Sequence, residues 1–108
     1  MIARTWHGRV RTAKADEYET FLERTGLADY AATPGYRGVL VTRRTEGDVT
    51  HFTLTSLWDS LDAIRGFAGR EVTRARYYEE DDDYLLEKEP FVTHADVVIA
   101  AITSSAAP

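Results

Sequence analysis

The chain has 108 residues, which suffices for one domain with a single hydrophobic core. It has no cysteine, which excludes disulfides, zinc–thiolate sites, iron–sulfur clusters and thiol nucleophiles. Its net charge of −5 comes from an acidic run between Glu79 and Glu89, and no basic stripe exists, so we expect no nucleic-acid partner. No apolar run is long enough to span a membrane, and the N-terminus runs directly into Ile2–Trp6 without the apolar core of a signal peptide. We therefore expect a cytoplasmic protein with no membrane partner.

The first half of the domain is predicted to be a strand, a helix and a turn. Residues alternate in type over Ile2–Arg11, which predicts a strand. Helical spacing of apolar residues predicts a helix over Lys14–Tyr30, with Thr12 as its N-cap. Gly26 is expected to weaken or break this helix near its end, and Thr33-Pro34-Gly35 is a turn that stops it.

Two further strands follow, over Val39–Thr45 and Val49–Trp58, joined by a short hairpin at Glu46-Gly47-Asp48. A second helix is predicted over Ser60–Phe67, with Gly69 at its C-cap.

The last third of the chain is predicted with one more strand. Another helical turn or two is expected over Arg70–Tyr78, and the acids of Glu79–Asp83 indicate a solvated loop. Val- and Ile-rich residues predict a last strand over Phe91–Ala101. The domain then spans 1–101, and residues 102–108 form a disordered tail.

The order of these elements is β-α-β-β-α-β, which predicts an α+β, ferredoxin-like fold. Right-handed crossovers place both helices on the same face of a four-stranded antiparallel sheet with strand order 4-1-3-2. The other face is left uncovered, and two copies packed sheet to sheet would cover it. We therefore expect a symmetric homodimer.

Several short motifs resemble the antibiotic biosynthesis monooxygenase superfamily of dimeric α+β barrels, over roughly residues 2–100. They are Trp6-His7-Gly8, the stretch 33–38, the hairpin 46–48, Leu57-Trp58-Asp59-Ser60 with Phe67-Ala68-Gly69, Tyr77-Tyr78, and Leu85-Leu86-Glu87 before Pro90. A subgroup of single-domain bacterial proteins, mostly without an assigned role, is the most similar. The superfamily includes cofactor-free quinol and anthrone oxygenases, heme-degrading enzymes, and small proteins without known activity.

The resemblance to the heme-degrading members does not extend to their iron site. Those members need a histidine on the second helical region and an asparagine on the first strand. Here the histidines are His7, His51 and His94, all on predicted strands, and the first strand has no asparagine. We therefore expect no cofactor, and the resemblance favours a cofactor-independent monooxygenase acting on a small aromatic or polyketide-type molecule.

Such a reaction needs an aromatic pocket, a base and donors that hold a developing oxyanion. The candidate wall residues are Trp6, Phe52, Trp58, Tyr77 and Tyr78, of which only Trp58 is carried over from the resemblance. His94 is the preferred base, because Asp96 lies on the same strand face and could fix its tautomer. Arg43, Arg74 or Arg76 could hold an anion.

Packing explains most of these residues equally well. Trp6, Trp58 and the two tyrosines are also typical core residues. His7 alternates with Trp6, so a histidine facing a partner subunit is the simpler interpretation. Three histidines on neighbouring strands raise the possibility of a metal site, but no carboxylate pair completes it and we expect no metal. Two other functions stay open, a non-catalytic ligand-binding or stress-associated dimer and an isomerase or cyclase.

Overall fold

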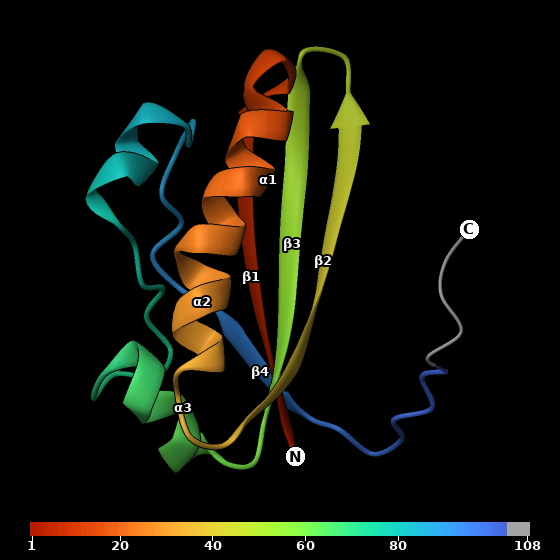
Figure 1. Ribbon diagram of the computed structural model, residues 1–108, viewed down its shortest axis with the longest axis vertical. Coiled ribbons are helices and arrows are strands. Elements are labelled where there is room, and N and C mark those ends of the chain that lie inside the picture. The colour runs from red at the N-terminus through yellow and green to blue at the C-terminus, as the bar shows by residue number, and fades with distance from the viewer. Residues whose placement is uncertain (104–108) are drawn as a thin grey trace.

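A computed structural model gives the structure of the protein and describes residues 1–103 (Figure 1). The first five elements, in chain order, are β1 (Ile2–Arg11), the 3-10 helix η1 (Thr12–Lys14), α1 (Ala15–Arg24), α2 (Gly26–Ala31) and β2 (Tyr36–Glu46). The remaining four are β3 (Val49–Trp58), α3 (Leu61–Ala68), the 3-10 helix η2 (Glu79–Asp83) and β4 (Thr93–Asp96).

The strands form one four-stranded antiparallel sheet in the order β2-β3-β1-β4, which is the predicted order read from the other edge. The helices α1, α2 and α3 lie on one face of this sheet (Figure 1). Buried and less buried residues alternate along β1 and β3, because one face of each strand packs on the helices. This confirms the α+β, ferredoxin-like fold.

The core lies between the sheet and the helices and is rich in aromatic side chains. Trp58 and Phe52 of β3 are fully buried, and they pack against rings from the helices. The Trp58 ring meets Tyr30 of α2 at 5.6 Å between ring centroids, and Phe52 meets Tyr18 of α1 at 5.2 Å. Such edge-to-face pairs stabilise the core beyond the area that they bury.

The predicted first helix is three shorter pieces. Thr25 separates α1 from α2, and its hydroxyl donates to the carbonyl of Phe21 over 2.7 Å. This side-chain bond competes with the regular helical hydrogen bonds. The helix is interrupted one residue before Gly26, where the sequence predicted that it would weaken or break. Thr12 does not cap the helix, because its hydroxyl donates instead to the carbonyl of Gly47 in the β2–β3 hairpin.

The segment between α3 and β4 differs most from the prediction. No α-helix forms between residues 69 and 78; the backbone there bonds across to residues 90–92, from Ala75 N to Pro90 O and from Val92 N to Thr73 O. Hydrogen bonds to a distant segment leave these groups unavailable for helical bonds. The acidic run Glu79–Asp83 is likewise not a loop but the helix η2, and one of its acids is buried.

The last strand is much shorter than the predicted Phe91–Ala101. β4 pairs only with the beginning of β1, where Asp96 lies opposite Ile2. Residues after Asp96 therefore run past the start of β1, where no neighbouring strand remains to pair with them. The other end of the same β1 edge is occupied by Leu85 and Leu86, the latter bonding to the carbonyl of Arg9.

Most of the predicted tail, residues 104–108, lies outside the part of the chain that the structure describes. Across residues 1–103, the helices are too short or too polar to cross a bilayer.

Candidate active site

A pocket lies between β1, the helices α1 and α2, and the segment that carries η2. Its cavity volume is about 40 Å³, below the usual size of small-molecule sites, about 300–1,000 Å³, so a ligand of that size would have to displace lining side chains. Its aromatic lining residues are Trp6, Tyr18, Phe21, Tyr30, Phe67, Tyr77 and Tyr78. Its charged lining residues are Arg4, Arg76 and Asp81.

Arg4 brings a buried positive charge to this pocket. It stands on the core-facing side of β1 and is 2% exposed. Its Nη1 donates to the carbonyl of Val72 and lies 3.2 Å from Nε2 of His94, while Nη2 donates to the carbonyl of Arg74 over 2.9 Å. Burial lowers the pKa of Arg4, since a charged guanidinium loses hydration there.

Asp81 brings a buried carboxyl group to the same pocket and is 4% exposed. Its Oδ1 accepts a hydrogen bond from the hydroxyl of Tyr18 at 3.2 Å, and its Oδ2 accepts from the backbone N–H of Tyr78 at 2.7 Å. Burial raises the pKa of Asp81 above its ordinary value, and these two donors only partly oppose the effect. A buried carboxyl group of this kind is suited to accept and return a proton.

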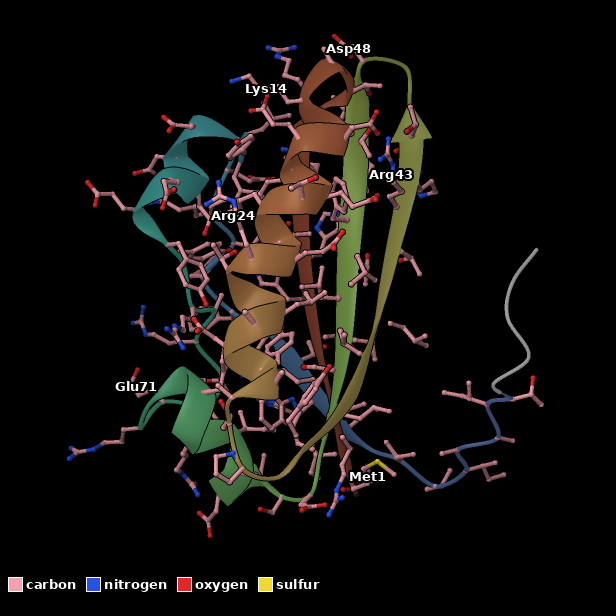
Figure 2. The ribbon with its side chains drawn as sticks, in the orientation of Figure 1. Met1, Lys14, Arg24, Arg43, Asp48 and Glu71 are labelled. Carbon is pink, nitrogen blue, oxygen red and sulfur yellow. The ribbon has the colours of Figure 1, made fainter. Side chains whose placement is uncertain are left out.

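Contacts from α1 and from the residue before it hold η2 in place beside the pocket. Lys14 Nζ donates to the carbonyl of Asp83 over 3.2 Å, and Arg24 pairs with Glu80 at 3.9 Å. Figure 2 shows Lys14 and Arg24 on the side of the helix that faces η2. These contacts explain how an acidic segment far along the chain comes to place one carboxyl group over the sheet.

The polar tips of three pocket tyrosines are already engaged. The Tyr77 hydroxyl accepts from Trp6 Nε1 at 3.2 Å and donates to the carbonyl of Glu89. The Tyr78 hydroxyl donates to Asp29, and Tyr18 donates to Asp81. Their rings therefore serve as walls, and their hydroxyls fix neighbouring groups.

The histidines are separated by the sheet. His94 pairs with Arg4 in the β1–β4 register and shares its core-facing side. His7 and His51 lie on the uncovered face, with His7 Nε2 2.9 Å from His51 Nδ1. Their outer nitrogens contact carboxylates, His7 with Glu89 at 2.5 Å and His51 with Glu46 at 2.8 Å. Within residues 1–103, no three potential metal ligands come together as a metal site.

Solved structures with the same fold were found, although no protein-family model matches the chain and no curated protein matches it. One is the heme-degrader MhuD from Mycobacterium tuberculosis with two hemes in its active site, at TM-score 0.62 and 15% identity, covering 94% of this chain and 99% of MhuD. A variant of MhuD with two manganese protoporphyrins per active site matches at 0.62 and 15%, over 95% and 100%. A candidate antibiotic biosynthesis monooxygenase from Bacillus cereus matches at 0.60 and 16%, over 93% and 97%.

The chain shares the fold of these three solved structures. Within this fold, the pocket does not fit an iron porphyrin held by a histidine, because no histidine or methionine is among its lining residues. His7 and His51 lie on the opposite face, and His94 reaches the pocket only through Arg4. The phenol oxygens of Tyr18, Tyr77 and Tyr78 already form the hydrogen bonds described above, so these three are not free to hold the iron.

The wall residues predicted from the sequence fall into two groups in the structure. Trp6, Tyr77 and Tyr78 line the pocket. Trp58 and Phe52 are fully buried in the core outside the lining, where Trp58 Nε1 donates to the hydroxyl of Ser56 over 2.9 Å.

His94, the predicted base, has Arg4 rather than Asp96 as its polar partner. Because a guanidinium only donates, Nε2 of His94 is the acceptor and its free hydrogen lies on Nδ1. Burial first, and the charge of Arg4 second, lower the pKa of His94. Of the arginines suggested for an anion, only Arg76 lines the pocket, and it already pairs with Asp29 at 3.1 Å.

Proposed function

We propose that this protein is a cofactor-independent monooxygenase acting on a hydroxylated aromatic or polyketide-type molecule, with Asp81 as its general base. The observation that carries the proposal is a buried carboxyl group with a raised pKa inside an aromatic pocket. The superfamily fold supports the reaction class by analogy only, since one fold hosts unrelated functions.

In the proposed reaction, Asp81 removes the proton of a substrate hydroxyl group. This hydroxyl group is the enol form of a ring whose keto form carries a CH₂ group, so the resulting anion shares its charge with a ring carbon that keeps one hydrogen. That CH carbon reacts with dioxygen, and the peroxide that forms loses the remaining hydrogen as its O–O bond breaks. One oxygen atom stays as a carbonyl and the other leaves as water, so CH₂ and O₂ give C=O and H₂O. The proton that Asp81 accepted is returned when water leaves.

His94 takes part in this proposal as a positioning residue for Arg4. Its Nε2 lone pair already accepts a hydrogen bond from Arg4, so that nitrogen is not free to take a substrate proton. Arg4 in turn lines the pocket and stabilises negative charge there. Trp6, Tyr77 and Tyr78 form the walls, while Trp58 and Phe52 support them through the core.

We further propose that the protein is a homodimer in which two sheets pack face to face. The helices leave one sheet face uncovered, and that face carries Leu40 of β2, which is 54% exposed (Figure 1). A second copy would remove this apolar surface from water.

Oxygen consumption tests the proposed reaction, with purified protein and a panel of quinols and anthrones. We expect uptake above the autoxidation rate, and about 10²–10⁴-fold less in Asp81→Asn. Asp83→Asn is the matched control, because Asp83 is an exposed acid of the same helix η2. An equal loss in both variants, or none in Asp81→Asn, contradicts the role of Asp81.

A parallel assay under argon separates the alternative functions. Turnover without oxygen indicates an isomerase or cyclase that uses the same acid–base group. Ligand binding without turnover in either atmosphere indicates a binding protein.

A further inference from the structure

Arg4 is a buried cation without an anionic partner. Its hydrogen bonds go to two carbonyl oxygens and to one neutral imidazole nitrogen. No carboxylate of residues 1–103 forms a salt bridge with it. A charge taken out of water without a counter-charge is costly, so the site is incomplete with respect to charge.

Part of the guanidinium is free to bind another group. A guanidinium has five N–H donors, of which Nη1 uses two and Nη2 uses one. The Nε–H and the second Nη2–H have no acceptor within the described chain. These two nitrogens form one edge of the guanidinium plane, which matches the two oxygens of a carboxylate.

The other pocket carboxyl group does not supply the missing charge. The charges that shift the pKa of Asp81 are those of Lys88 and Asp82, and Arg4 is not among them. The beginning of β1, which carries Arg4, lies near the bottom of Figure 1, whereas η2 lies near its top. The pocket therefore has a cation at one end, an acid at the other and aromatic walls between them.

We propose that the pocket binds aromatic carboxylates, with the carboxylate paired to the Nε–Nη2 edge of Arg4. The inference names the substrate class of the site in the proposed function, and binding itself does not require that a reaction follows. A hydroxyl group at the opposite end of the ring system would then lie toward Asp81. A hydroxyaryl carboxylate therefore complements both ends of the pocket, with its carboxylate at Arg4 and its hydroxyl group at Asp81.

A pair of probes that differ only in charge tests the inference on the unaltered protein. The probes are 6-hydroxy-2-naphthoate and 6-hydroxy-2-naphthamide, titrated by calorimetry near neutral pH. We expect the carboxylate to bind about tenfold or more tightly than the amide, since hydrogen bonds to a charged group are the stronger ones. Equal affinities, or a preference for the amide, overturn the inference.

Variants then test whether Arg4 causes the preference for the carboxylate over the amide. Arg4→Gln should bring the ratio of the two affinities close to one, and Arg4→Lys should retain part of it as a point charge. Arg37→Gln is the control, because Arg37 is exposed, pairs with Asp59 and does not line the pocket. If the ratio of the two affinities is unchanged in Arg4→Gln, Arg4 is not the group that binds the carboxylate. If Arg4→Gln does not fold, the two probes titrated into the unaltered protein decide the inference.

The two proposals fail in different ways. Carboxylate preference without oxygen uptake leaves the ligand class standing and removes the oxygenase. Oxygen uptake with neutral anthrones, together with equal binding of the carboxylate and amide probes, supports the oxygenase and removes the ligand class.

Discussion

The hydroxyl of Tyr18 donates to Oδ1 of Asp81 over 3.2 Å, and both side chains are buried. This bond favours the ionised carboxylate, so it opposes the rise in the pKa of Asp81 that burial causes. Tyr18→Phe should therefore raise the pKa of Asp81 further. A pH titration of the Asp81 carboxyl carbon by ¹³C NMR measures the change.

Tyr84→Phe is the matched control for this titration. Its hydroxyl donates to Glu17 over 2.8 Å and not to Asp81. An unchanged or lower pKa in Tyr18→Phe would show that the tyrosine does not stabilise the ionised form.

Asp81 should also make the stability of the protein depend on pH. Unfolding returns the carboxyl group to water, where its pKa is about 3.9, below its value in the folded protein. Between these two pKa values the folded state holds more protons, so the free energy of unfolding falls as the pH rises. Asp81→Asn removes this dependence, and its stability relative to the unaltered protein should improve with increasing pH.

Urea unfolding at a series of pH values from about 4 to 8 measures this slope. Asp83→Asn serves again as control and should keep the slope of the unaltered protein. The loss of one hydrogen bond to Tyr18 or Tyr78 shifts the Asp81→Asn curve but does not change its slope. A slope that is the same with and without Asp81 contradicts the prediction.

Alternation along the chain predicts the two central strands with their observed bounds, Ile2–Arg11 and Val49–Trp58. It succeeds because one face of each strand packs on helices and the other does not. The Val- and Ile-rich composition of Phe91–Ala101 predicts a strand that is too long, since the length of β4 depends on where its partner strand begins. That information is not in the segment itself.

The two charged pocket residues differ in how far the sequence could have revealed them. Arg4 stands on the same face of its strand as Trp6 and Val10, and a charged side chain on an apolar face is a usable signal. Asp81 has no such signal among five consecutive acids. Its burial depends on Tyr18, which lies far away in the sequence.

Gly8 of β1 makes room for a wall of the pocket. A Cβ atom at this position would lie 2.4 Å from the Trp6 ring and 3.0 Å from Leu85. Gly8→Ala should therefore displace the Trp6 ring, lower the free energy of unfolding by about 1–3 kcal/mol and weaken ligand binding. Urea unfolding and calorimetry with 6-hydroxy-2-naphthoate measure the two effects.

Gly26→Ala is the comparison for this substitution. A Cβ atom there meets nothing within 4 Å, and Gly26 begins α2. It should leave stability unchanged or raise it by about 0.4–1 kcal/mol through the unfolded chain. Equal losses in both variants would mean that contact with Trp6 is not the cause.

The proposed dimer rests on which face of β2 carries Leu40. Leu40 lies opposite Thr55, which alternates with the buried residues Leu54 and Ser56 of β3. Leu40 therefore points to the uncovered face, where a partner sheet would bury it.

In sedimentation velocity at tens of micromolar we expect twice the mass of the chain. Leu40→Glu should shift the protein toward the single chain because it places a charge in an apolar contact. Leu61→Glu is the control, since Leu61 is 41% exposed on α3 at the other side of the sheet. A single chain in the unaltered protein, or equal dissociation by both variants, contradicts face-to-face packing.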